Sequence, residues 1–332
     1  MFKVAVFSSK KYDKNFLDKF NFNTSLAFEY FESKLSAETV ELASGFDAIC
    51  IFVNDTADKH VLEKLASFGI KVIALRCAGF NNVDIEAAQQ LGLQICRVPE
   101  YSPEAVAEHT VGLMLTLSRK FHKAYNRIRE DNFSLDGLMG FNLHNKTVGI
   151  IGTGNIGLAT LRILKGFGCH LLCSDPTEND EAVAMGCRYV SADTLFEESD
   201  IISLHCPLLP QTKHIINEQS LAKMRPDVML INTSRGGLID SHAVVKALKE
   251  RRLGYLGIDV YELESSLFFE DLSGEIIQDD VFARLSTFPN VLITGHQGFF
   301  TQEAISTIAK TTISNLQHLL EKKTLDKAFL LY

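Results

Sequence analysis

The sequence lacks a long apolar run, an excess of basic residues, and any tandem repeat or low-complexity segment. No apolar run approaches the roughly 18 residues that a membrane-spanning helix needs. The net charge of −8 argues against a nucleic-acid-binding surface, because such surfaces depend on clustered Lys and Arg. An anionic substrate would therefore need a local cation. The first residues, MFKVAVFSSKKYDK, alternate like a strand and then turn polar, so we expect no signal peptide.

Cysteine is also scarce, with seven residues, an odd number. Most of them lie inside apolar runs, so we expect buried, reduced thiols in a cytoplasmic protein. One cluster, Cys169-His170-x-x-Cys173, could be mistaken for a metal site. On an extended strand, however, positions four apart are separated by roughly 13 Å, and His170 faces the opposite side. We therefore expect no metal there.

The 332 residues, 46% hydrophobic and 22% charged, suit a soluble globular protein of two domains. The first hundred residues alternate between strand-like and helix-like segments, which predicts a parallel α/β sheet covered on both faces. Strands are expected at 3–8, 26–32, 47–53, 71–77 and 93–98, and helices at 11–19, 36–44, 59–68 and 84–91. Ligands bind beyond the carboxyl ends of such strands. This rule points to residues 52–54, 76–79 and 99–101 as one cluster.

The segment RVPEYSP at 97–103 marks a domain boundary, because each proline disfavours helix in the residue before it. A strongly apolar helix over 104–119 follows and should be buried or lie at an interface. A long helix over 301–321 is expected to return to the first domain, which has no other obvious C-terminal cover. The prediction is two doubly wound α/β domains, residues 1–100 plus 300–332 and residues 101–299, with a hinge and an interdomain cleft.

The stretch KTVGIIGTGNIGLATLRILKGFGCHLLCSD at 146–175 organises the second domain. It reads as strand, G-x-G-x-x-G turn, helix, strand and acid, the order of a dinucleotide-binding βαβ unit. Gly152 allows the tight turn, Gly154 lets the backbone approach a pyrophosphate, and Gly157 lets helix and strand pack closely. The alternative is a purely structural glycine turn. Further strands are expected near 188–190, 200–206, 227–233, 255–259 and 291–294.

The acid at the end of this unit predicts the choice of cofactor. Asp175 lies 18 positions after Gly157 (175 − 157), close to the roughly 20 expected for an acid that binds the adenosine ribose. Its carboxylate can accept hydrogen bonds from both ribose hydroxyls and would repel a 2′-phosphate. The sequence therefore favours NAD over NADP.

Three polar stretches follow predicted strands of the same domain. Arg235 lies in LINTSRGGLID, Asp259 and Glu264 in GIDVYELE, and His296 in VLITGHQGFF. Separately, each has an ordinary alternative: a surface cation, a solvated loop acid or a turn histidine. Together they bring one cation, one imidazole and one carboxylate to strand ends of one sheet.

Hydride transfer to a 2-oxo acid needs this set of groups. A guanidinium can hold the substrate carboxylate with directed N–H donors. The carbonyl oxygen gains negative charge as hydride arrives, so a proton donor must stand beside it. Histidine suits this step because its unperturbed pKa is about 6.5, and a neighbouring carboxylate stabilises the imidazolium.

These motifs resemble the D-isomer-specific 2-hydroxyacid dehydrogenases over nearly the whole chain. The likeness rests on GTGNIG at 152–157, LHCPL at 204–208, INTSRGGLID at 231–240, GIDVYELE at 257–264 and GHQGFF at 295–300. Within the family it is strongest to fermentative D-lactate dehydrogenases, through RCAGFNNVD at 76–84, VPEYSPEAVAEH at 98–109 and LFFEDLSGEIIQDDVF at 267–282. The resemblance implies a flavodoxin-like substrate domain, a Rossmann NAD-binding domain, and NAD-dependent reduction of pyruvate to D-lactate.

The resemblance also implies a role for individual residues. His296 would be the acid/base, Glu264 its carboxylate partner, and Arg235 the group that binds the substrate carboxylate. The implied substrate contacts are Phe52, Ala78, Gly79, Tyr101 and Phe299. The implied cofactor contacts are Gly152, Thr153, Gly154, Asn155, Ile156, Gly157, Asp175, His205, Cys206, Pro207, Thr212, Thr233, Ser234 and Asp259.

Several alternatives stay open from sequence. Phe52, Tyr101 and Phe299 suggest a small apolar pocket that suits the methyl group of pyruvate, but Phe52 could equally belong to the core. A broader D-2-hydroxyacid dehydrogenase acting on larger 2-oxo acids, or an NAD(H)-sensing corepressor-like scaffold, are the rival functions. Family likeness suggests a homodimer or homotetramer, and the apolar helix over 106–117 is a plausible interface.

Overall fold

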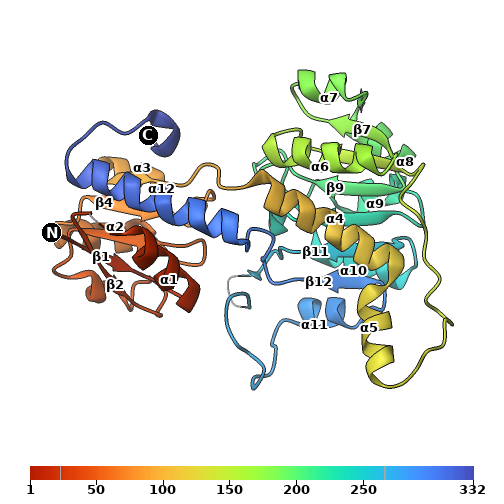
Figure 1. Cartoon of the computed structure of the whole chain (residues 1–332), viewed down its shortest axis with the longest axis horizontal. Coiled ribbons are helices and arrows are strands. Elements are labelled where there is room, and N and C mark those ends of the chain that lie inside the picture. The colour runs from red at the N-terminus through yellow and green to blue at the C-terminus, as the bar shows by residue number, and fades with distance from the viewer. Residues whose placement is uncertain (23, 265–266) are drawn as a thin grey trace. The chain divides into compact units, whose positions relative to one another are not determined.

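The computed structural model describes residues 1–22, 24–264 and 267–332. It divides into two compact units, Met1–Ser102 with Phe300–Tyr332, and Pro103–Phe299. Each unit is built on one parallel sheet with helices around it (Figure 1). The prediction of two parallel α/β domains is therefore confirmed.

The first unit has a five-stranded parallel sheet in the order β2-β1-β3-β4-β5. This is the flavodoxin-like order, in which the chain reverses direction of winding between β1 and β3. All residues of β3 and β4 are buried, as expected for strands covered on both faces. The strands are β1 (Phe2–Val6), β2 (Leu26–Tyr30), β3 (Ala48–Ile51), β4 (Val72–Leu75) and β5 (Gln94–Cys96).

The helices of the first unit include the last long helix of the chain. Helix α12 packs on α1 and on β4, and its Ile313 and Leu316 lie in the core of this unit. The Thr301 side chain accepts a hydrogen bond from the Ala304 N–H and so caps the first turn of α12. The elements are α1 (Lys11–Phe20), α2 (Lys59–Ser67), α3 (Ile85–Gln90), α12 (Gln302–Leu320) and the 3-10 turns η1 (Val40–Ala43) and η4 (Lys327–Phe329).

The predicted helix over 36–44 is wrong for most of its length. Only Val40–Ala43 is helical, and it is a 3-10 turn. The Thr39 hydroxyl accepts a hydrogen bond from the Ser36 N–H and donates one to the Lys34 carbonyl. These local side-chain bonds satisfy backbone groups that a helix would otherwise need, which favours a turn.

The second unit has a seven-stranded parallel sheet in the order β12-β11-β10-β9-β6-β7-β8. This is the Rossmann order extended by one strand, with its switch point between β6 and β9. Ligands of such sheets bind where the carboxyl ends of those two strands diverge. The strands are β6 (Thr147–Ile151), β7 (His170–Ser174), β8 (Arg188–Tyr189), β9 (Ile201–Leu204), β10 (Met229–Asn232), β11 (Tyr255–Ile258) and β12 (Val291–Ile293).

Helix α4 crosses one face of this sheet beside α6 (Figure 1). Its Val111, Leu113, Met114 and Leu117 are buried in one core cluster with residues of α6 and of the sheet. The apolar character of the predicted helix over 104–119 is thus explained by burial within its own unit. The helices of the unit are α4 (Pro103–Arg119), α5 (Phe121–Arg129), α6 (Asn155–Gly166), α7 (Asp180–Ala184), α8 (Ala192–Glu198), α9 (Glu218–Lys223), α10 (Ser241–Lys249) and α11 (Asp280–Ser286), with the 3-10 turn η2 (Gly236–Leu238).

Within residues 1–22, 24–264 and 267–332, no helix is both long enough and apolar enough to cross a membrane.

Candidate active site

The glycine turn after β6 has the geometry that its sequence predicts. Gly152 has φ +97°, and a Cβ there would lie 2.6 Å from the Cys206 nitrogen. A Cβ at Gly157 would lie 2.1 Å from the Gly152 carbonyl oxygen, so only glycine lets α6 pack so closely on the turn. A Cβ at Gly154 would meet open space, which leaves room for a ligand beside the backbone.

Helix α6 begins at this turn and presents its amino end to the same space. Gly154 is its N-cap residue and provides no side-chain cap, and Asn155 and Ile156 form the first helical positions. The first N–H groups of a helix are donors that an anion can bind. This arrangement fits a pyrophosphate group.

Asp175 lies at the end of β7 and is held by the backbone on both sides. Its Oδ2 accepts a hydrogen bond from the Thr153 N–H (2.8 Å), and its Oδ1 accepts one from the Thr177 N–H (3.0 Å). The Tyr189 hydroxyl donates to the Thr153 hydroxyl at 2.9 Å. The predicted acid therefore stands next to the glycine turn, where the ribose of a dinucleotide bound to that turn would lie.

The loop after β9 carries a neutral histidine. The His205 N–H donates to the Ile151 carbonyl at 2.8 Å, and its Nε2 lies 2.9 Å from the Ser203 hydroxyl. Burial lowers the pKa of His205 to about 4. The ring is therefore uncharged at neutral pH and serves as a polar but neutral part of the loop at the switch point.

The loops after β9 and β10 are joined by the side chain of Ser234. The Ser234 hydroxyl donates to the Cys206 carbonyl at 2.8 Å. The Thr212 hydroxyl donates to the Pro207 carbonyl at 2.6 Å, within the loop after β9. Burial raises the pKa of the Cys206 thiol to about 11, so it stays protonated. Together with Asp175 and the glycine turn, these loops form a connected set of the residues predicted to bind the cofactor.

His296 and Glu264 form a direct pair. The His296 Nδ1 lies 2.8 Å from the Glu264 Oε1, and both side chains are partly buried, at 18% and 24% exposure. The Tyr261 N–H donates to the other oxygen of Glu264 at 2.9 Å. Because Nδ1 faces the carboxylate, Nε2 is the atom that can exchange a proton with a ligand.

Two phenylalanines flank the His296 ring. The Phe269 ring centroid lies 5.7 Å from that of the imidazole, and the Phe299 centroid lies 6.4 Å away in an edge-on arrangement. Phe299 is among the residues predicted to contact substrate, whereas Phe269 lies in the segment 267–282 and has no role predicted from sequence. Its φ of +69° is unusual for a bulky residue. No periodicity in the sequence predicts that Phe269 takes this conformation or lies beside His296.

Arg235 follows β10 in a loop that is fixed by Asn232. The Asn232 side chain donates to the Arg235 carbonyl at 2.8 Å and accepts from the Ser234 N–H at 3.1 Å. The Arg235 Nη1 donates to the Ser234 carbonyl at 2.7 Å. At the next residue, a Cβ on Gly236 would lie 2.1 Å from the Tyr261 carbonyl carbon. The glycine therefore lets the arginine loop lie directly against the loop that leads to Glu264.

Asp259 is buried and its carboxylate is surrounded by donors of its own unit. It accepts hydrogen bonds from the Thr294 hydroxyl and from the N–H groups of Gln297 (2.9 Å) and Gly298 (2.8 Å). His109 Nε2 lies 3.3 Å away. Burial raises the pKa of Asp259, but the donors from His109, Thr294 and Gln297 outweigh it and leave that pKa below its usual range.

The residues of the first unit that were predicted to contact substrate follow β3, β4 and β5. Phe52 is buried, and the Arg76 guanidinium lies over its ring at 5.0 Å from the centroid. The Ala78 carbonyl accepts a hydrogen bond from Arg97, which fixes the loop after β4. Gly79 lies in the same loop, and Tyr101 is half-buried just before the end of this unit. Phe52 therefore packs against Arg76, which is itself buried, and also follows the carboxyl end of β3.

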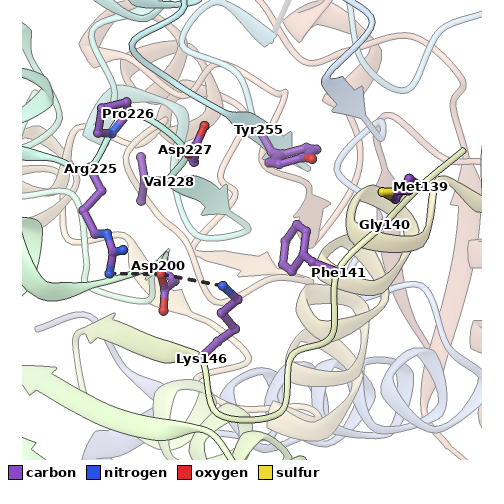
Figure 2. Close-up of a pocket in the computed structure, with 10 residues that line it drawn as sticks. All are labelled: Met139, Gly140, Phe141, Lys146, Asp200, Arg225, Pro226, Asp227, Val228 and Tyr255. Carbon is purple, nitrogen blue, oxygen red and sulfur yellow. Dashed lines mark ion pairs between the residues drawn. The ribbon is translucent and has the colours of Figure 1, made fainter. Parts of the chain in front are cut away.

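A pocket of about 510 Å³ lies near the amino ends of strands of the seven-stranded sheet (Figure 2). Among its lining residues, Lys146 precedes β6 and Tyr255 begins β11, so it lies at the amino ends of the strands. Lys146 and Arg225 both pair with the Asp200 carboxylate, at 3.9 and 3.1 Å. Asp227 also lines the pocket, so its two cations are balanced by two carboxylates. The predicted site residues of this unit follow the carboxyl ends of the strands instead.

Comparison with known proteins gives the family. Residues 111–298 match the family described as D-isomer specific 2-hydroxyacid dehydrogenase, NAD binding domain. The chain is 54% identical over 322 residues to the D-lactate dehydrogenase of Escherichia coli K12, which covers 97% of this chain and 98% of that protein. The chain therefore belongs to the D-isomer specific 2-hydroxyacid dehydrogenases, and the family resemblance, the enzyme class and the NAD cofactor predicted from sequence are confirmed.

Solved structures agree with this assignment. The apo structure of the E. coli D-lactate dehydrogenase matches with a TM-score of 0.90 at 51% identity, covering 99% of this chain and 100% of that one. The structure reported with the identification of the pyruvate reductase of Chlamydomonas reinhardtii matches with a TM-score of 0.92 at 44% identity, covering 98% of both chains.

Proposed function

We propose that this chain is an NAD-dependent D-lactate dehydrogenase, which transfers hydride from NADH to pyruvate and, in reverse, oxidises D-lactate. The observation that carries the proposal is the 2.8 Å pair of His296 and Glu264 in a unit that also holds a dinucleotide turn. The similarity to a D-lactate dehydrogenase over 97% of the chain supports the choice of substrate.

The cofactor would be held by the residues at the carboxyl ends of the second sheet. The open space at Gly154 and the uncapped start of α6 suit the pyrophosphate, and the Asp175 carboxylate suits the ribose hydroxyls. The loops of His205–Pro207 and Thr233–Ser234 would border the rest of the cofactor. When bound, NADH supplies the hydride for the reaction.

The remaining chemistry belongs to side chains of this chain. Arg235 would bind the substrate carboxylate through its guanidinium N–H groups, with help from the backbone N–H groups of Ala78 and Gly79. His296 would donate a proton from Nε2 to the carbonyl oxygen as that oxygen gains charge, and would take it back in the oxidation of D-lactate. Glu264, held by the Tyr261 N–H, would accept the Nδ1–H of His296 and so fix the orientation of the ring.

The size of the substrate would be set by aromatic side chains. We assign Phe52, Tyr101 and Phe299 to the walls around the substrate methyl group, and the position of Phe299 against His296 supports this for one of the three. One methylene in such a pocket changes discrimination by only about 1–3 kcal/mol. The second candidate function is therefore a broader D-2-hydroxyacid dehydrogenase that accepts larger 2-oxo acids.

We further assign the substrate-binding role to the unit Met1–Ser102 with Phe300–Tyr332.

We also expect a homodimer or homotetramer. Helix α5 and the segment after it expose large apolar side chains, which include Tyr125 (63%), Phe133 (71%), Leu135 (81%) and Met139 (87%). Exposed apolar groups of this number favour an interface between copies of the chain. Sedimentation equilibrium would test this, and a monomer at micromolar concentration would contradict it.

The substrate assignment is tested with purified protein, NADH and a panel of 2-oxo acids of increasing side-chain length. We expect the highest kcat/KM with pyruvate, and oxidation of D-lactate but not of L-lactate in the reverse assay. A higher kcat/KM for a branched 2-oxo acid would favour the broader dehydrogenase. NADH consumption no faster than in a protein-free control would favour a nucleotide-sensing scaffold instead.

A further inference from the structure

Two neighbouring residues of α4 contact two different loops of the candidate site. His109 Nε2 lies 3.0 Å from the Thr294 hydroxyl, which belongs to the loop that leads to His296. Thr110 lies next to it and contacts the Thr233 hydroxyl at 2.7 Å, in the loop that leads to Arg235. His109 ends the segment VPEYSPEAVAEH, which carries part of the family resemblance, but neither residue of α4 has a role predicted from sequence.

The hydrogen bonds around His109 have a defined direction. The Thr294 hydroxyl has one proton, and it donates that proton to the Asp259 carboxylate. Thr294 can therefore only accept from His109, so the Nε2 of His109 must carry a proton. This N–H is shared between the Thr294 oxygen at 3.0 Å and the Asp259 Oδ1 at 3.3 Å.

Asp259 transmits this anchoring to the backbone around His296. Its carboxylate accepts the N–H groups of Gln297 and Gly298, and its carbonyl accepts the His296 N–H at 2.7 Å. His296 itself has φ +52°, a left-handed conformation that a non-glycine residue adopts only when its surroundings hold it there. The carboxylate is buried, with 2% of its side chain exposed, so a lost donor is not replaced by bulk water.

Thr110 gives an internal comparison on the same helix. Its hydroxyl donates to the Val106 carbonyl at 2.8 Å, so the Thr233 hydroxyl must be the donor in the bond between the two threonines. Thr233 lies two residues before Arg235. The two neighbours on α4 therefore act on separate loops, one with the proposed proton donor and one with the proposed carboxylate-binding group.

We propose that His109 is a positioning residue for the reaction: its Nε2–H fixes Asp259 and Thr294, and through them the backbone that orients His296. The kinetic effect of His109 rests on the proposed function, whereas its contacts with Asp259 and Thr294 do not. Thr110 plays the corresponding part for the Arg235 loop. Because a misplacement of about 1 Å can cost on the order of 100-fold in rate, a contact remote from the substrate can control kcat.

The test compares His109→Leu, which removes the donor, with His109→Gln, whose amide nitrogen can occupy the position of Nε2. We expect His109→Leu to lower kcat for pyruvate about 10- to 100-fold, with KM and the NADH dissociation constant each within about threefold of wild type. His109→Gln should recover most of the loss. Glu108→Ala, at the exposed position beside His109, is the matched control and should behave as wild type.

Thr110→Val should give the opposite kinetic pattern, because it acts on the Arg235 loop. We expect the KM for pyruvate to rise more than kcat falls, with recovery in Thr110→Ser. If His109→Leu also raised KM and left kcat unchanged, or if His109→Gln were as impaired as His109→Leu, the positioning role would be overturned.

A second readout does not depend on turnover. Hydrogen exchange of the Gln297 and Gly298 amides in ligand-free protein should be faster by about 10-fold or more in His109→Leu, and near wild type in His109→Gln and Glu108→Ala. Thr294→Val, which removes the same link from the other side, should also accelerate it. Unchanged exchange in both His109→Leu and Thr294→Val would refute the proposal. Absence of turnover in wild type would refute the proposed function alone, since the exchange comparison would still decide the role of His109.

Discussion

Single side chains at the site are oriented chiefly by backbone groups. The Asp175 carboxylate accepts two N–H groups, and Glu264 accepts one from Tyr261 while its other oxygen faces His296. A residue held in this way loses little further freedom when a ligand binds, so the site is ordered before the reaction begins.

Asp175 should determine the preference between NADH and NADPH. Replacing it with Ala removes the negative charge that would repel a 2′-phosphate, so the ratio of kcat/KM values for NADH over NADPH should fall by about 10-fold or more. Steady-state kinetics with both cofactors measure this ratio. Asp175→Asn keeps an acceptor for the Thr153 N–H and so isolates the effect of charge. A ratio unaltered in both variants would remove Asp175 as the selector.

Residues were predictable from sequence where chemistry limits the choice of side chain. One example is the glycine turn with an acid after the next strand. Another is the set of Arg235, Glu264 and His296, which all follow predicted strands of one sheet. His109, Thr110 and Phe269 were not singled out because their importance depends on which loops α4 and the Phe269 segment contact. Such contacts between residues far apart in the chain leave no local pattern.

At the scale of elements, the strands were easier to predict than the short helices. Strands such as 47–53 and 71–77 are buried runs of apolar residues, and they appear as β3 and β4. The segment 36–44 has no long apolar stripe, so local bonds of Thr39 decide its conformation. Helix α5 was not predicted, although Phe121, Ala124, Tyr125 and Ile128 recur at helical spacing along it.

The loop after β9 should make the stability of the second unit depend on pH. In the folded state the pKa of His205 is about 4, whereas in the unfolded chain the pKa of a histidine is about 6.5. Between these values only the unfolded state is protonated, so stability is lost as pH falls from about 6.5 and the loss is complete below about 4. The expected cost is on the order of 3 kcal/mol.

The measurement is urea unfolding of ligand-free wild type and His205→Gln at several pH values. The free energy of unfolding of wild type minus that of the variant should decrease between pH 7 and pH 4, because the variant does not titrate there. Other groups cancel in this difference. A difference that stays constant over this range would show that His205 does not stay neutral in the folded state.

At the scale of the whole molecule, two parallel sheets of different order are joined in one chain. The order β2-β1-β3-β4-β5 and the order β12-β11-β10-β9-β6-β7-β8 each direct polar loops to the carboxyl ends of the strands. The β–α alternation predicted the architecture of both, because parallel strands need crossover helices. Strand order was not predictable in this way, since it depends on which strands pair across long stretches of sequence.

The central claim is that His296 supplies the proton for reduction of a bound 2-oxo acid. The most direct test compares NADH oxidation by wild type and His296→Gln with saturating pyruvate, alongside NADH binding measured by fluorescence. We predict a loss of about 100- to 10,000-fold in kcat with an NADH dissociation constant within about threefold of wild type. A kcat within a few fold of wild type would contradict the account.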